Sequence, residues 1–338
     1  MWNGRTFNGT LFAEYSEQES DSTTVPDLSF LFSPPEGLTL ATILAIAFIL
    51  GLLHGATPDE HTWPITFSYA VGSYSSKGGM KTGFIFSLGF TLQRAILTTL
   101  GFLGLAAFYI TYNLNGPVYV IVGVAMFIAG SYVLKGRYIH LPFDCLFCRE
   151  HHTSRAERIQ PHETLGNVPP RMALVHGLIA GFGFGAYASI ITFILAPQVQ
   201  SLIYAPLVGV LFGLGTMVMQ IIFGAVFARL VGAKKLGEDA VKYIGRSTAG
   251  RTLYYGGILF AIIGALIVAF PLLSNLAIST GNSIPNLDSI GVSTILVLGT
   301  VGVIGIGSMI RGYRELVRMS RIREEEKESS DKLPKVSE

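Results

Sequence analysis

Imidazole and carboxylate side chains cluster in the stretch 54–61, which has the sequence HGATPDEH. Four potential ligands, His54, Asp59, Glu60 and His61, follow an apolar run that begins at Gly37 and carries no charge before Asp59. Histidine with carboxylate suits divalent transition metals. At the end of a membrane helix such groups usually mark an ion or substrate path. The stretch predicts a metal site; the alternative is a helix end whose polar groups only meet water and headgroups.

Two prolines are expected to interrupt the helix that carries this stretch. Pro58 disfavours helical geometry at Thr57, and Pro64 does the same to Trp63. We therefore expect the helix to break near Thr57. Backbone carbonyls freed by such a break could join the side chains around a cation.

The composition places these residues in a membrane protein. Of the 338 residues, 50% are hydrophobic and only 14% are charged, whereas soluble proteins carry about 25% charged residues. The apolar runs are unbroken, which excludes the alternating pattern of a membrane β-barrel. The expected fold is all-α and polytopic, with the lipid bilayer as its surroundings. The net charge of +2 gives no reason to expect nucleic acid as a partner.

Seven apolar segments are each long enough to cross a bilayer as a helix. They form a predicted membrane domain over 37–310, preceded by a polar, acidic extracytoplasmic arm (1–36) and followed by a cytoplasmic tail (311–338). The predicted spans are 37–56, 82–109, 116–134, 172–196, 204–228, 252–274 and 289–310.

Lysine and arginine alternate between the connections. The connections after spans two, four and six (111–115, 197–203 and 275–288) contain neither residue, whereas those after spans one, three, five and seven are basic. Because basic loops stay in the cytoplasm, we expect a multi-pass cell-membrane protein with its N-terminus outside and its C-terminus in the cytoplasm.

The sequence also shows weak internal symmetry. Leu-His-Gly at 53–55 resembles Val-His-Gly at 175–177, and Phe-Ser-Leu-Gly at 86–89 resembles Phe-Gly-Leu-Gly at 212–215. Spans one to three would run opposite to spans four to six. This predicts a 3+3 inverted repeat plus one extra helix, with the site where the repeats meet.

His176 is a further candidate ligand. It precedes glycines at 177, 181 and 185, whose spacing of four forms a smooth stripe on one helix face. The stripe would let span four lie tightly against span one, so that His176 approaches His54 from the same membrane side. The alternative is a packing helix with a histidine at its interfacial end.

Span two contains Arg94 in mid-membrane, where an arginine must find a partner. Asp59 or Glu60 could supply that partner, and the pair would then fix the geometry of the break. Gln93 and Gln220 are expected to support the site as polar neighbours.

A second predicted metal site lies in the cytoplasmic loop 135–171. A C-x2-C pair with nearby histidines supplies thiolate and imidazole ligands for a tetrahedral zinc ion. The alternatives are a redox pair and unliganded surface residues. The candidates are Cys145, Cys148, His151, His152 and His162.

The spacing His54-x4-Asp59, with His61, resembles the H-x4-D-H signature of the nickel/cobalt transporter family, and 86–89 resembles the start of that family's next motif. His176-Gly177 resembles related urease-accessory and exporter-type membrane proteins. The resemblance implies transport of Ni²⁺ or Co²⁺, with His54, Asp59 and His61 as ligands.

The chain departs from the family pattern at two of these places. Glu60 stands between Asp59 and His61, so the second histidine is displaced by one residue. Phe90 occupies the position where the family's following motif has histidine.

The expected function is secondary transport of a divalent transition metal (nickel, cobalt or zinc), without enzymatic activity. Three alternatives remain open. A thiol-redox membrane protein would use Cys145 and Cys148, an exporter of small organic or sulfur-containing anions would use Arg94, and a metal-dependent membrane enzyme would activate water at a metal bound in 54–61.

Overall fold

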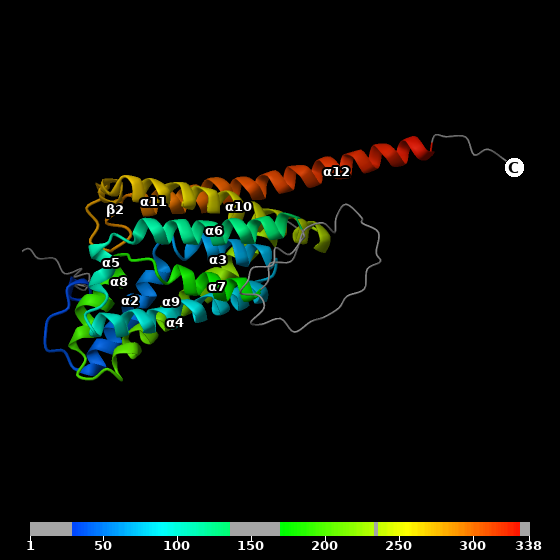
Figure 1. Ribbon diagram of the computed structural model, residues 1–338. Helices are drawn as coiled ribbons and strands as arrows, with labels where there is room; N and C mark the ends of the chain where they lie inside the picture. The colour runs from blue at the N-terminus through cyan, green and yellow to red at the C-terminus, as the bar shows by residue number, and fades with distance from the viewer. Residues whose placement is uncertain (1–28, 136–169, 233–235, 332–338) are drawn as a thin grey trace, which may run out of the picture.

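The computed structural model describes residues 29–135, 170–232 and 236–331 of the chain. Long helices lie side by side along one direction, and α12 (Gly307–Asp331) extends beyond the others at one end (Figure 1). We call this the α12 end of the bundle. The opposite end, where α5 (Ala107–Thr111) lies, is called the α5 end.

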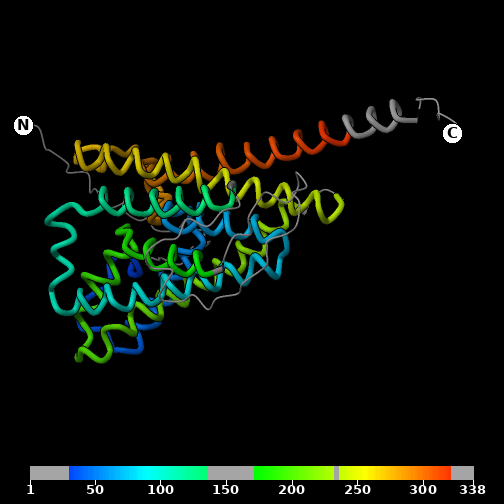
Figure 2. Tube along the Cα trace, turned by 45° about the vertical axis from the view of Figure 1, so that its right-hand side comes forward, coloured from blue at the N-terminus to red at the C-terminus, as the bar shows by residue number. Residues whose placement is uncertain are grey.

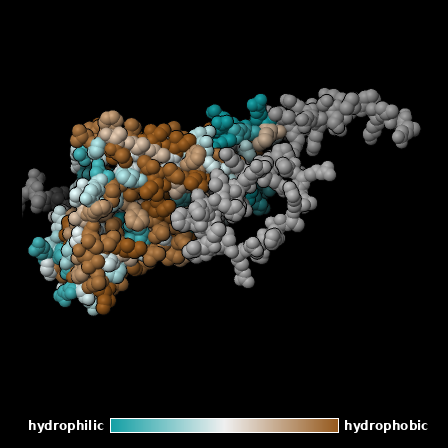
Figure 3. Space-filling view, in the orientation of Figure 1, coloured by the Kyte–Doolittle hydropathy of each residue, from teal (hydrophilic) through white to brown (hydrophobic). Residues whose placement is uncertain are grey.

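Five helical segments of the described residues are long and apolar enough to cross a membrane. Their outer surface is largely hydrophobic, whereas hydrophilic residues gather near the start of the projecting part of α12 (Figure 3). The expectation of an all-α polytopic membrane protein is confirmed to this extent. The segments are α4 (Ser76–Phe102), α6 (Asn115–Lys135), α9 (Ala205–Gly232), α10 (Glu238–Ala269), and the continuous run of α11 (Val292–Val297), η5 (Leu298–Ile306) and α12.

The first predicted span ends where it was expected to, and a further buried helix follows it. The short helix α1 (Ser29–Phe32) precedes α2 (Leu40–Ala56), which ends where Thr57 takes an extended backbone (φ −84°, ψ 147°) before Pro58. After the segment 57–62, α3 (Trp63–Gly72) resumes the helix, and its residues from Pro64 to Gly72 are all buried. The break near Thr57 is confirmed, and its polar residues are buried within the bundle.

The fourth predicted span, 172–196, is not one continuous helix. Helix α7 ends at Ala180, and the glycine-rich segment 181–185 follows it. Glycine is among the weakest helix formers, so three glycines in five residues explain this second break. The elements of this span are α7 (Pro170–Ala180), α8 (Ala186–Ser189), the π-helical η2 (Ile190–Leu195) and η3 (Ala196–Gln198).

The two halves of the chain pack against each other reciprocally. Helix α2 packs on α9, and α7 packs on α4. A side chain on Gly51 of α2 would collide with the Phe212 carbonyl of α9, and one on Gly177 of α7 would collide with the Phe86 carbonyl of α4. Both contacts follow one rule, a step of 126 residues: adding 126 to a position in the first half gives its equivalent in the second half (Gly51 and Gly177, Phe86 and Phe212).

Further close contacts repeat this step. A side chain at Gly215 would collide with the Phe48 carbonyl, and one at Gly89 would collide with the Leu174 carbonyl. Likewise, a side chain at Gly83 would collide with the Gln220 carbonyl, and one at Gly209 with the Arg94 carbonyl. The latter two contacts show that α4 and α9 are antiparallel, so the halves form an inverted repeat.

The two sequence matches implied different registers, and only one of them is observed. Matching 86–89 with 212–215 implies the step of 126 residues that the contacts show, whereas matching 53–55 with 175–177 implied 122. His54 therefore corresponds to Ala180, and His176 corresponds to Leu50. The two histidines do not occupy equivalent places.

Helices α6 and α10 are the last long helices of the two halves. They pack side by side and antiparallel, because Gly116 lies against the Gly264 carbonyl and Gly130 lies against the Gly250 carbonyl. Outside the two repeats, η5 and α12 pack against α10 (Figure 2). Between α10 and α11, at the α5 end, come η4 (Pro271–Asn275) and a short antiparallel pairing of β1 (Ile278–Ser279) with β2 (Ser289–Ile290).

Candidate functional site

The first break places four ionisable side chains inside the bundle. His54, Asp59, Glu60 and His61 are each no more than 4% exposed. We expected this stretch at the cytoplasmic end of a span. The buried helix α3 follows the stretch, so most of it lies between two helices inside the bundle, α2 and α3.

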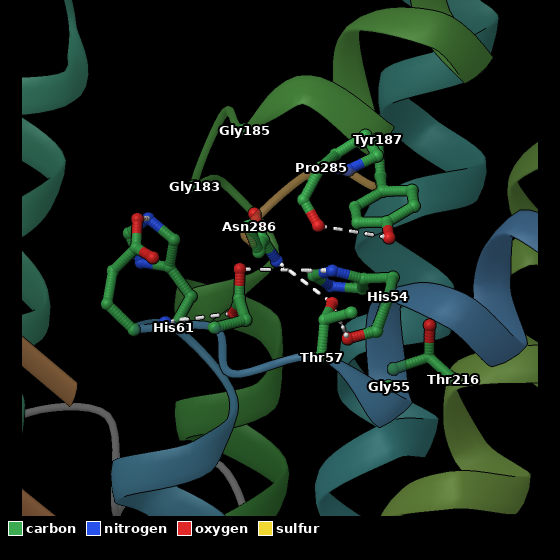
Figure 4. A network of polar contacts seen from close by, with 12 residues as sticks. His54, Gly55, Thr57, His61, Gly183, Gly185, Tyr187, Thr216, Pro285 and Asn286 are labelled. Carbon is green, nitrogen blue, oxygen red and sulfur yellow. Dashed lines mark hydrogen bonds and ion pairs between the residues drawn. The ribbon is translucent and has the colours of Figure 1, made fainter. Parts of the chain in front are cut away.

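His54 faces Asp59 within an aromatic enclosure. Figure 4 shows its ring beside Tyr187. The His54 ring packs against those of both Phe90 and Phe212, with centroid distances of 5.6 and 5.2 Å and interplanar angles of 22°. Its Nδ1 lies 3.8 Å from Asp59 Oδ2, which is too long for a hydrogen bond. Neither ring nitrogen has a hydrogen-bond partner among the described residues. This imidazole is therefore enclosed but available for a ligand.

Asp59 is held in place by the start of α3. Its Oδ1 accepts a hydrogen bond from the backbone N–H of His61 at 3.0 Å. Its own carbonyl accepts from the N–H groups of Thr62 (3.3 Å) and Trp63 (3.0 Å). These bonds orient the carboxylate and leave Oδ2 directed at His54.

Glu60 and His61 form a second pair, against α6. His61 Nε2 lies 3.3 Å from Glu60 Oε1, and the Tyr119 hydroxyl donates to the same oxygen at 2.8 Å. The His61 ring stacks on that of Tyr119, with centroids 5.1 Å apart. A side chain at Gly183 would collide with the His61 ring, so the second break lies directly against this pair.

The predicted ligands His54, Asp59 and His61 are neighbours, but they are divided between these two pairs. Within residues 29–135, 170–232 and 236–331, no three His, Cys, Asp or Glu side chains come close enough to hold a metal ion. In this conformation the first break thus offers two imidazole–carboxylate pairs.

His176 does not approach His54 as expected. Its Nδ1 is hydrogen-bonded to the Tyr69 hydroxyl of α3 at 2.6 Å. The predicted packing partner was also wrong, because Gly177 contacts α4, and Gly181 lies beside Gln93 of α4. A side chain at Gly185 would have no atom within 4 Å, so this third glycine belongs to the break and does not pack against a helix.

Arg94 is bound to the second break and not to a carboxylate. Its Nη2 donates to the Gly183 carbonyl at 2.9 Å, and its guanidinium carbon lies 4.6 Å from the centroid of the Phe90 ring. The guanidinium has no ion pair with Asp59 or Glu60 among the described contacts. Its Nε and Nη1 lack hydrogen-bond partners in the described part of the chain.

The two predicted supporting glutamines differ in their surroundings. Gln220 Oε1 of α9 accepts a hydrogen bond from the Thr66 hydroxyl of α3 at 2.5 Å. The amide of Gln93 has no hydrogen-bond partner among the described residues. Gln220 therefore forms a hydrogen bond between the two repeats. The side-chain amide of Gln93 lies beside the second break without a hydrogen-bond partner among the described residues.

The aromatic enclosure was not foreseen from the sequence. Phe212 and Phe86 begin the repeated motif, which was used only for the symmetry argument. Tyr187, whose ring centroid is 5.6 Å from that of His54, and Tyr119 gave no recognisable signal. The predicted loop site at Cys145, Cys148, His151, His152 and His162 lies outside the described residues and remains a prediction.

The helices and the buried polar site define an α-helical membrane protein with an inverted repeat and two broken helices. Comparison of the chain with protein-family models, with curated proteins and with solved structures finds no match.

Proposed function

We propose that the protein is a membrane transporter for a divalent transition-metal cation such as Ni²⁺, Co²⁺ or Zn²⁺. The observation that carries the proposal is the buried His54 ring, whose nitrogens lack hydrogen-bond partners among the described residues and face Asp59. A buried polar group without a partner costs free energy and calls for an explanation. A cation that binds between imidazole and carboxylate provides one.

The charge of the site supports the same cargo. With both histidines neutral, the buried Asp59, Glu60 and Arg94 carry two negative charges and one positive charge. Buried charge is costly unless it is compensated. The site then has a net charge of −1, which favours a cation over an anion as its ligand.

The architecture suits alternating access. Transporters built from inverted repeats place the substrate at broken helices where the repeats meet and expose it by rocking one repeat against the other. Here His54 comes from α2 of the first repeat and Tyr187 from α8 of the second. His54 and Asp59 form the primary ligand pair, and Glu60 with His61 forms an adjacent pair that could join it after a conformational change.

Seven crossings remain part of the proposal, with the broken α2–α3 and α7–η3 segments as the first and fourth. The α5 end would face the outside, because its described segments 29–39, 103–114, 199–204 and 270–291 contain no lysine or arginine. The α12 end would then face the cytoplasm.

Uptake of Ni²⁺, Co²⁺, Zn²⁺ and Mn²⁺ into proteoliposomes tests the proposal. We expect His54→Ala and Asp59→Asn to lower uptake of the transported metal about 10- to 100-fold, as loss of metal-site groups commonly does. Asp239→Asn is the matched control, because that carboxylate is exposed at the start of α10. Unchanged uptake of all four metals in both site variants would remove the proposal.

Export of small organic or sulfur-containing anions is a second candidate, favoured by the Arg94 nitrogens that lack partners among the described residues. The nearby carboxylates oppose it. If this candidate is correct, Arg94→Gln should abolish anion efflux. If the metal proposal is correct, metal uptake should be lost in the His54 and Asp59 variants.

A further inference from the structure

A strap crosses the α5 end of the bundle. We use this name for residues 276–291, which connect η4 to α11. The pairing of Ile278 with Ile290 closes it into a loop, and the backbone N–H of Thr280 donates to the Asp288 carbonyl at 2.8 Å. The strap therefore has a defined shape.

Two consecutive strap residues turn toward the site. Pro285 is buried although much of the surrounding strap is exposed, and its carbonyl accepts a hydrogen bond from the Tyr187 hydroxyl at 3.2 Å. Asn286 has a left-handed backbone (φ 68°), which asparagine tolerates better than most residues. Its Nδ2 donates to the Thr57 hydroxyl at 3.2 Å.

These two bonds join the strap to both helix breaks. Thr57 directly follows α2, and its hydroxyl donates in turn to the Leu53 carbonyl at 3.0 Å. Tyr187 lies in α8, just after the second break. Figure 4 shows both strap contacts close to the His54 ring. The strap thus covers the His54 side of the site.

A cavity of about 330 Å³ lies beside the strap. It is lined by Pro58 and Trp63 from the first break, by Asn286 and Leu287 from the strap, and by η5 residues including Leu298. This space lies next to Asn286 and Pro58, so Asn286 has room beside its contact with Thr57.

We propose that the strap is the gate of the transport site at the α5 end. It opens when Asn286 releases Thr57 and Pro285 releases Tyr187. Because the two residues are consecutive, the contacts break together and free both helix breaks at once. This inference rests on the proposed transport function and adds the element that controls access. The strap lies outside the repeated segments, so it gives this end a closure that the symmetry of the repeats does not supply.

A reversible covalent lock tests the gate. In protein freed of its native thiols by Cys145→Ser and Cys148→Ser, the changes Thr57→Cys and Asn286→Cys place a thiol on each side of the contact. Bridging them with a short bis-methanethiosulfonate reagent should reduce metal uptake into proteoliposomes about tenfold or more, because the gate-open population is removed. Reduction should restore uptake.

The matched control bridges two residues that the strap already pairs. Ser279 and Ser289 are cross-strand partners, so bridging cysteines at these positions should leave uptake unchanged. Failure of the Thr57–Asn286 pair to bridge, unchanged uptake once it is bridged, or equal inhibition by the control bridge would each overturn the gate.

Thiol labelling separates failure of the gate from failure of the transport proposal. In the thiol-free protein carrying His54→Cys, a membrane-impermeant maleimide added at the α5 end should react about tenfold faster when Asn286→Ala and Tyr187→Phe are present, because two hydrogen bonds that hold the gate closed are lost. An unchanged rate overturns the gate. Faster labelling, combined with no metal uptake by the protein that retains His54, would support the gate while the transport proposal fails.

Discussion

A buried hydrogen bond between Thr66 of α3 and Gln220 of α9 helps to connect the helix after the first break to the second repeat. Both residues are almost completely buried, and the hydroxyl donates to Gln220 Oε1 at 2.5 Å. A buried polar group that loses its partner keeps the cost of desolvation.

We predict that Thr66→Val and Gln220→Leu each lower the free energy of unfolding in detergent by about 1–3 kcal/mol. The double variant should lose less than the sum of the single losses, since contacting residues are coupled. Chemical denaturation of the four proteins measures this coupling. Strict additivity would show that the bond contributes nothing.

At the residue scale, the sequence predicted the break but not the pairing around it. Pro58 acts on its neighbour Thr57, so the break follows from local sterics. The pairing of His61 with Glu60 depends on Tyr119, which reaches the site only through the packing of α6. Local reasoning therefore identified the ionisable residues and missed their division into two pairs.

At the scale of elements, two glycine contacts hold the repeats together. Gly51 of α2 and Gly177 of α7 each lie against a backbone carbonyl of the opposite repeat, at Phe212 and Phe86. Backbone cannot move aside as a flexible side chain can, so an added methyl group must push the helices apart.

We predict that Gly51→Ala and Gly177→Ala lower the thermal midpoint in detergent by similar amounts. Overpacking of this kind costs about 1–3 kcal/mol. Gly307→Ala, at a helical position where a side chain would meet nothing within 4 Å, should leave the midpoint unchanged or raise it slightly. Equal behaviour of all three variants in a thermal melt would contradict the reciprocal packing.

The second break shows why element boundaries were harder to predict than element types. No proline marks residues 181–185, and the spacing of Gly177, Gly181 and Gly185 suits a packing stripe as well as a break. The two sequence matches gave different steps for a related reason. The glycine–backbone contacts that select the step of 126 residues exist only between elements distant in sequence.

At the scale of the whole molecule, charge separates the two ends of the bundle. The α5 end has no lysine or arginine in its described segments, whereas the projecting helix α12 begins with Arg311, Arg314 and Arg318. The sequence alone predicted this separation, because it depends on composition and not on packing.

We predict that, in thiol-free protein expressed in intact cells, Asn275→Cys is labelled by a membrane-impermeant maleimide and Ser320→Cys is not. Asn275 lies in η4 at the α5 end, and Ser320 lies in α12. Labelling after cell lysis is the control for reactivity. The opposite pattern in intact cells would reverse the proposed orientation.

The 126-residue step has a consequence for stoichiometry. It sets Asp59 and Glu60 opposite Gly185 and Ala186, so the fixed negative charge at the breaks comes from one repeat only. The two repeats are therefore symmetric in their backbone contacts but not in their charges. If the chain transports a metal ion as proposed, we expect it to carry one ion per cycle at this charged break.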